Sequence, residues 1–117
     1  MSREIKVIVV PINSGLMGDH HGVANGYVGV YKDHPWYRKH YDELQDVQVH
    51  GGLTYSDSRN PETFKCDRDW WYVGFDTCHS GDTCTFWDMN RVMMETQYLH
   101  AQAVVVYGKE VVTDNGN

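Results

Sequence analysis

The sequence lacks the features of secreted, membrane-spanning and nucleic-acid-coating proteins. Its 117 residues include only three cysteines, and 16 acidic residues outnumber 10 lysines and arginines, which gives a net charge of −6. Three cysteines cannot form an even disulfide framework, and the spacing of Cys66, Cys78 and Cys84 does not match a paired zinc knuckle. We therefore expect free thiols. The acidic balance argues against contact with the phosphate backbone of long DNA or RNA.

Long hydrophobic runs are also missing. The N-terminal stretch MSREIKVIVVPINSG holds one short apolar run, too brief for the core of an ordinary signal peptide or for a membrane span. We found no internal repeat, low-complexity segment or dividing linker. The sequence therefore predicts one domain over residues 1–117, with a frayed tail at 113–117, in a cytoplasmic protein that does not contact membranes.

The pattern of apolar residues predicts an α+β fold. Alternation and β-branched runs indicate four strands, and three- and four-residue spacing from about Trp87 to Ala103 indicates a long helix. Asp33 and Pro35 suit the start of a short helix over 34–44. Residues 103–112 could continue the long helix or form a late strand. We expect an antiparallel sheet of four or five strands, with the long C-terminal helix on one face and the short helix at an edge. The predicted strands are 4–10, 26–32, 46–56 and 70–76.

Strand parity divides the side chains between the two faces of this sheet. The face toward the helix would carry the aliphatic core together with Trp71, Val73 and Phe75. The opposite face would combine aromatic rings with hydrogen-bonding groups, which suits a planar ligand. Aromatic residues make up 13% of the chain, enough for either a core or a stacking surface. The residues predicted on the opposite face are Tyr27, Tyr31, Gln48, His50, Thr54, Trp70, Tyr72 and Asp76.

The loop after the fourth strand carries Asp76, His79 and Asp82 at three-residue intervals, with Gly81 allowing a tight fold. These three side chains could hold a divalent metal, and His50 could add a fourth ligand or a general base. The alternative is structural: Asp76 caps a turn, Asp82 accepts backbone amides and His79 packs under the loop. Both interpretations remain open at this point, and no cofactor is certain.

The stretch HGGLT, residues 50–54, has the same two interpretations. Glycines after His50 could let a ligand approach the backbone, with Thr54 as a further donor, or they could simply bend the strand. The parity of His50 favours the ligand-binding interpretation. Cys78 next to His79 does not make a catalytic dyad, since adjacency in sequence is not the spatial pairing that a dyad needs.

Several of these motifs resemble a family of small uncharacterised proteins of bacteriophages and prophages. The resemblance covers about residues 25–102 and rests on the glycine-valine strand, HGGLT, and WWYVGFDTCHSGD. It departs from the family pattern at Thr77 and Cys78 and in the loop through MGDHHG. The resemblance implies a phage origin and a place in the host cytoplasm. Small phage proteins often counter host defence, and some of them capture or destroy nucleotide signals, so the resemblance also favours a nucleotide-like ligand.

Three functions therefore stay in view. The leading one is a phage accessory protein that binds a small planar, nucleotide-like ligand, aided by homo-oligomer formation. The second is a metal-dependent phosphodiesterase or nucleotidase with His50, Asp76, His79 and Asp82 as candidate catalytic residues. The third is an inhibitor that binds a host protein. The ligand-binding residues expected are Tyr27, Tyr31, His50, Thr54, Trp70, Tyr72, Asp76, His79 and Asp82.

Overall fold

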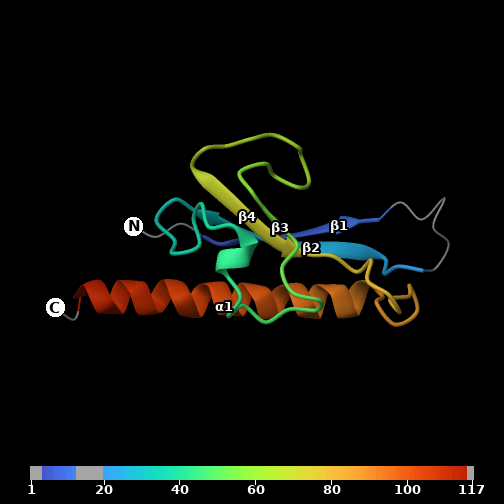
Figure 1. Ribbon diagram of the computed structural model, residues 1–117. Helices are drawn as coiled ribbons and strands as arrows, with labels where there is room; N and C mark the ends of the chain where they lie inside the picture. The colour runs from blue at the N-terminus through green and yellow to red at the C-terminus, as the bar shows by residue number, and fades with distance from the viewer. Residues whose placement is uncertain (1–3, 13–19, 116–117) are drawn as a thin grey trace.

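The computed structural model describes the backbone of residues 4–12 and 20–115, and side chains as far as residue 108. It confirms the α+β arrangement. A four-stranded sheet lies against one long helix, α1 (Met89–Asn115), and one short 3₁₀ helix follows the second strand (Figure 1). The strands are β1 (Lys6–Pro11), β2 (Ala24–Tyr31), β3 (Tyr55–Asp57) and β4 (Trp70–Phe75). The 3₁₀ helix is Tyr41–Glu43.

The sheet has the order β1-β2-β4-β3, and every pair of neighbours is antiparallel. The central pair, β2 and β4, aligns Val28 with Val73. Both valines are fully buried on the face toward α1. The β-branched residues of β1 and β2 suit this half-buried, pleated surface. The three strands predicted over 4–10, 26–32 and 70–76 are present.

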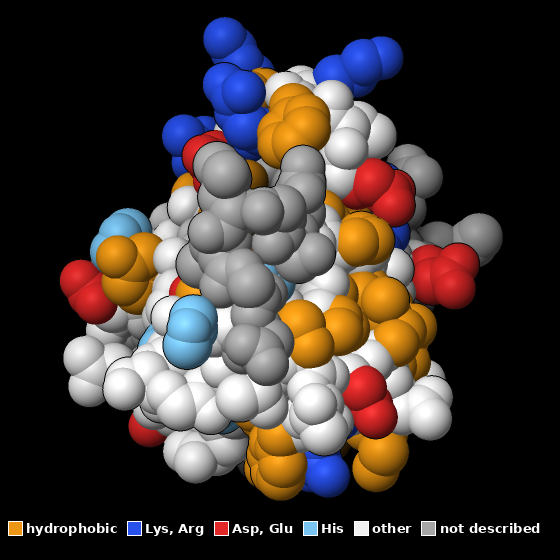
Figure 2. All heavy atoms as spheres, turned by 90° about the vertical axis from the view of Figure 1, so that its right-hand side faces the viewer, with side chains coloured by type: hydrophobic (Ala, Val, Ile, Leu, Met, Phe, Trp, Pro, Cys, Tyr) orange, Lys and Arg blue, Asp and Glu red, His pale blue; other side chains and the backbone are white. Residues whose placement is uncertain are grey.

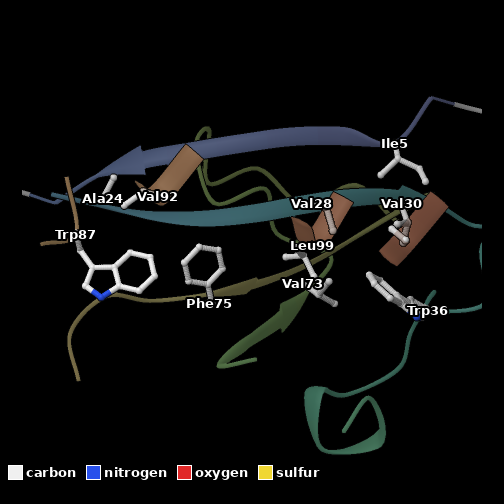
Figure 3. Close-up of a cluster of buried hydrophobic side chains, with 11 residues drawn as sticks. Ile5, Ala24, Val28, Val30, Trp36, Val73, Phe75, Trp87, Val92 and Leu99 are labelled. Atoms are coloured by element: carbon white, nitrogen blue, oxygen red, sulfur yellow. The ribbon is translucent and has the colours of Figure 1, made fainter. Parts of the chain in front are cut away.

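The core lies between the sheet and α1. The residues of α1 that face it recur at four- and three-residue steps, as the sequence predicted: Val92, Thr96, Leu99 and Ala103 are fully buried. Trp36 and Trp87 stand at opposite ends of the buried cluster, with Phe75 between them (Figure 3). The core therefore draws on segments outside the sheet and α1 to close its ends.

The start of α1 is set by Asp88, whose carboxylate accepts a hydrogen bond from the backbone N–H of Arg91 at 2.9 Å. The helix then continues through residues 103–112, which resolves that open alternative in favour of helix, and its backbone extends to Asn115. The expected tail at 113–117 is thus helical over its first three residues, and the last two lie outside the described part. No helix in that part is both long and apolar enough to cross a membrane.

One predicted element is shorter than expected and another is wrong. The short helix expected over 34–44 is present as the 3₁₀ helix Tyr41–Glu43 and is preceded by turns, because Arg38 has a left-handed backbone with φ of 61° that interrupts any α-helix. Residues 46–54 do not form a strand, and only Tyr55–Asp57 pairs with β4. In place of a strand partner, Gln48 exchanges two hydrogen bonds with the side chain of Gln102 on α1, at 2.8 and 2.7 Å. The 46–54 segment therefore crosses α1 (Figure 1).

Candidate functional site

The predicted histidine and carboxylates do meet, although His50 reaches them from a loop. His50 Nε2 lies 2.9 and 3.0 Å from the two carboxylate oxygens of Asp82, which is 5% exposed. The His50 ring packs on Trp87 with centroids 4.1 Å apart, and its backbone N–H donates to Glu95 at 2.7 Å. The contacts with Trp87 and Glu95 place His50 beside α1. The prediction that it projects from the opposite face of the sheet is wrong, because it is not in a strand.

His79 is the third member of this cluster and contacts both His50 and Asp82. Its ring lies edge-on to His50 with centroids 5.3 Å apart, and its backbone N–H donates to Asp82 at 2.9 Å. Its Nε2 lies 3.3 Å from an Asp76 oxygen but does not form a hydrogen bond. Gly51, with φ of 70°, provides the room, since a Cβ there would overlap with the His79 ring. The sequence predicted that a ligand could approach the backbone at the HGGLT glycines. At Gly51 the ring of His79 takes that place.

The carboxylates behave as the structural alternative predicted. Asp76 accepts from the backbone N–H of Cys78 at 2.9 Å, and Asp82 accepts from His79 and His50. Among the residues that the structure describes, no three His, Cys, Asp or Glu side chains are arranged to hold a metal ion. The Asp76, His79 and Asp82 metal set therefore has no support in the geometry.

Cys78 gains no activation from its surroundings. Burial raises the pKa of its thiol, and the charges of Asp76 and Asp82 raise it further. A raised pKa keeps the sulfur protonated at neutral pH and weakens it as a nucleophile. The arrangement of His50, Asp82 and His79 ties two loops to the start of α1, and it has the geometry of a structural network.

The opposite face of the sheet is filled by the protein's own rings. Tyr72 is only 2% exposed, and its ring lies across Gly29, where a Cβ would be 2.7 Å from Tyr72 Cε1. Tyr27 lies across Gly74 in the same way, and a Cβ there would overlap with its ring. Both pairs are cross-strand partners of β2 and β4. The space that the glycines open is occupied by these tyrosines, so Tyr72 cannot line an open ligand site as predicted.

The remaining rings of this face also contact one another. Tyr27 meets Tyr55 edge-on at 5.2 Å, and Tyr31 meets Trp70 edge-on at 5.4 Å, with the Lys6 ammonium 3.8 Å from a Trp70 ring centroid. Burial raises the pKa of Tyr55 to about 12. Tyr27, Tyr31 and Trp70 remain partly exposed at the edges. Thr54, also exposed, extends the β3 pairing through its backbone N–H, which donates to Gly74 at 2.9 Å.

A different pocket combines aromatic rings with positive charge. It has a volume of about 330 Å³ and is lined by Tyr37, Arg38, Ser58, Arg68 and Trp71; we call it the basic pocket. Two arginines thus line the same space as two aromatic residues and a serine, in a chain whose net charge is negative. Within the described part of the chain, neither Arg38 nor Arg68 forms an ion pair with a carboxylate.

Three segments that are distant in the sequence build this basic pocket. The hydroxyl of Tyr37 donates to the backbone carbonyl of Arg68, and the indole N–H of Trp71 donates to the carbonyl of Lys39 at 2.9 Å. The first bond holds the 37–39 turn against the β3–β4 connection, residues 58–69, and the second holds it against β4. That connection also contains Arg59 and Lys65. It lies at the top of Figure 1, and Lys and Arg side chains gather at the top of Figure 2, which is turned about the vertical axis.

Sequence reasoning missed this pocket. Arg38 fell within a predicted helix, Trp71 was assigned to the core alone, and Arg68 lay in a connection without a periodic pattern. The left-handed backbone of Arg38 is a local irregularity of the kind that often accompanies binding sites. Comparison of the chain with protein-family models, with curated proteins and with solved structures finds no match. The geometry is therefore the basis for any functional conclusion.

Proposed function

We propose that this protein binds a small, planar and anionic ligand, of which a nucleotide is the best example, in the basic pocket. The observation that carries the proposal is that two arginines and two aromatic residues line one space of about 330 Å³: Arg38, Arg68, Tyr37 and Trp71. A volume near 300 Å³ is at the lower end of the range for small-molecule sites. The pocket would therefore take one nucleotide or part of a larger one.

The chemistry of each group matches one part of such a ligand. Guanidinium groups bind phosphate through paired, charge-assisted hydrogen bonds, and the absence of carboxylate partners among the described residues leaves both groups available. Aromatic side chains stack on nucleobases with little dependence on base identity. Ser58 would add one hydroxyl for a sugar or phosphate oxygen.

The resemblance to small bacteriophage proteins gives this binding a biological setting. A phage accessory protein that holds a nucleotide in the host cytoplasm would lower the free concentration of a defence signal without needing to destroy it. Binding alone is sufficient for that role. The expected site on the opposite face of the sheet is replaced in this proposal by the basic pocket, since Tyr72 and Tyr27 already fill the former.

Isothermal titration calorimetry with adenosine, AMP, inorganic phosphate and a cyclic dinucleotide tests the proposal. We expect a phosphate-bearing nucleotide to bind more tightly than adenosine or phosphate alone, and the affinity to fall as salt is raised. Arg68→Gln should weaken binding by about tenfold or more, which is about 1.4 kcal/mol. Arg59→Gln is the matched control, because Arg59 is in the same connection but does not line the pocket.

Two results would contradict the proposal. One is the absence of binding by all four probes up to millimolar concentration. The other is equal loss of affinity in Arg68→Gln and Arg59→Gln, which would indicate a diffuse effect of charge. Mass analysis of the recovered nucleotide separates capture from hydrolysis: an unchanged nucleotide supports capture, whereas conversion would favour the hydrolase.

A further inference from the structure

A second concave surface lies on the α1 side of the molecule and has a different character. It is a groove of about 480 Å³ between α1 and the segment that contains the 3₁₀ helix. Tyr98, Ala101, Gln102, Val105 and Val106 form the α1 wall. These positions follow the spacing i, i+3, i+4, i+7 and i+8, so they form one continuous stripe about 12 Å long on the helix.

The opposite wall is apolar at its base and acidic at its rim. Trp36, Leu44 and Val47 contribute the apolar part, and Glu43 and Asp46 contribute two exposed carboxylates. Trp36 is 4% exposed and belongs to the core, which makes the base of the groove rigid. The apolar surface is thus continuous from the core to the solvent.

The groove is held open by a fixed connection between its walls. Gln102 on α1 accepts from the backbone N–H of Gln48 and donates to the carbonyl of the same residue, at 2.8 and 2.7 Å. This reciprocal pair sets the distance between α1 and the 46–54 segment. The groove is therefore preformed, and an occupant would not bear the cost of separating the walls.

Its apolar wall is unusually exposed. Val105 is 54% exposed and Tyr98 is 49% exposed, and the neighbouring Met94 is 69% exposed. Large apolar side chains that gather on one helix at this exposure are typical of a protein-binding surface. Flexible methionines near the groove would help it adapt to the shape of a partner.

The charge of the rim selects the kind of partner. Among the described residues, no lysine or arginine lines the groove, and Asp46 forms no ion pair with any of them. The Glu43 carboxylate accepts from the backbone N–H of His40 at 2.9 Å. An occupant with basic groups next to its apolar face would neutralise both carboxylates, whereas an acidic one would be repelled.

We infer that this groove binds an amphipathic helix of another protein, with apolar side chains at i, i+3, i+4 and i+7 and with lysine or arginine beside them. A short helical segment fits an apolar groove of this length, and this mode of recognition is widespread. A second copy of the chain is a poorer occupant, since it would bring the same acidic rim and a net charge of −6 to the contact. The basic pocket is a separate surface with no lining residue in common with this groove.

A peptide selection on the full-length protein tests the inference. The probe is a library of 18-residue helical peptides with leucine at the four apolar positions and with lysine, glutamate or glutamine at the flanking positions. We expect lysine to be enriched at the flanks at least fivefold over glutamate. We also expect Asp46→Lys to abolish this enrichment or to reverse it.

Two adjacent valines supply matched controls. Val105 lines the groove and Val104 does not, although both are on α1 and are 54% and 46% exposed. Val105→Asp should lower the affinity of a selected peptide at least tenfold, and Val104→Asp should leave it unchanged, provided that both variants melt at the wild-type temperature. Should Val105→Asp unfold the chain, Val105→Ser with Val104→Ser gives the same comparison.

Three outcomes would overturn the inference. The first is that no peptide is enriched, or that glutamate is enriched at the flanks. The second is that Val104→Asp and Val105→Asp weaken binding equally. The third is a wild-type dimer in light scattering that Val105→Asp dissociates and Val104→Asp does not, because the occupant would then be a second copy of the chain.

Discussion

Tyr72 lies across Gly29, its partner on the adjacent strand, and closes the space that the glycine leaves. The first prediction follows from this contact. Gly29→Ala would place a methyl group 2.7 Å from the Tyr72 ring, and Tyr72 is too deeply buried to move freely. We expect a loss of about 1–3 kcal/mol in the free energy of unfolding, as for other overpacked cores, measured in urea.

Gly108→Ala is the control for this change. Gly108 is in α1, and nothing lies within 4 Å of the position that a Cβ would take there, so alanine should stabilise the helix by up to about 1 kcal/mol. Equal stability of Gly29→Ala and wild type would mean that the Tyr72 ring is not held in this position.

The second prediction concerns the network around Asp82. Asp82→Ala leaves two partly buried donors, His50 Nε2 and the backbone N–H of His79, without their acceptor. The cost should be about 1–3 kcal/mol for each donor that stays unsatisfied. Asp76→Ala should cost less, because Asp76 is more exposed and accepts one hydrogen bond from Cys78. Urea unfolding of the two variants measures the difference, and a larger loss for Asp76→Ala would contradict this account.

The third prediction is a loss of stability in mild acid through His34. Its Nε2 donates to the carbonyl of Ala103 at 2.8 Å, and its Nδ1 accepts from the backbone N–H of Trp36 at 2.9 Å. The bond from Trp36 requires the neutral ring, because a protonated Nδ1 cannot accept, whereas Nε2 can donate to Ala103 in either form. Burial lowers the pKa of His34 below its usual 6.5, although the Ala103 carbonyl and Asp33 act in the opposite direction.

Because the folded pKa is the lower one, the unfolded chain binds the proton more readily. The stability that His34 contributes is complete above its unfolded pKa and is lost as the pH falls from that value toward the folded pKa. We expect urea midpoints to decrease from about pH 7.5 to about pH 5, and the decrease to be smaller in His34→Gln. Parallel curves for the two proteins would exclude His34 as the responsible group.

The fourth prediction compares two adjacent tryptophans. Trp71 packs against the core and donates to Lys39, whereas Trp70 contacts Tyr31 and Lys6 at the outer face. Trp71→Ala should therefore destabilise the protein by about 3 kcal/mol, toward the lower end of the cost for buried tryptophans because its ring is partly exposed. Trp70→Ala should cost clearly less. Thermal unfolding of both variants measures the two losses of stability, and a larger loss in Trp70→Ala would contradict this prediction.

The sequence predicted correctly those strands and the helix whose buried residues recur at regular intervals. Alternation and β-branched runs were sufficient for β1, β2 and β4, and the spacing of Val92, Thr96, Leu99 and Ala103 was sufficient for α1. The 46–54 segment failed because Val47 and Val49 alternate like a strand but pack against the core from a loop. Its hydrogen bonds go to Gln102, 54 residues away, and no local pattern reveals such a partner.

The candidate sites were predictable to different degrees. Asp76, His79 and Asp82 were close in sequence, and their meeting with His50 followed the expectation even though the route of His50 did not. The basic pocket depends on Tyr37 reaching the carbonyl of Arg68, a contact across 31 residues. The facing of Tyr72 was correct, but its burial was not foreseen, because it depends on the connection through Asn60 that folds over it.

The four tryptophans occupy four different surroundings, and this distribution gives the protein its own optical reporters. Trp36 is at the base of the groove, Trp71 lines the basic pocket, Trp87 carries the histidine cluster and Trp70 is on the outer face. Indole emission responds to the polarity and charge around the ring. Replacing three of them by phenylalanine leaves a single indole, which can be excited at wavelengths where the tyrosines do not absorb. Each surface can then be followed separately in solution without attaching a dye.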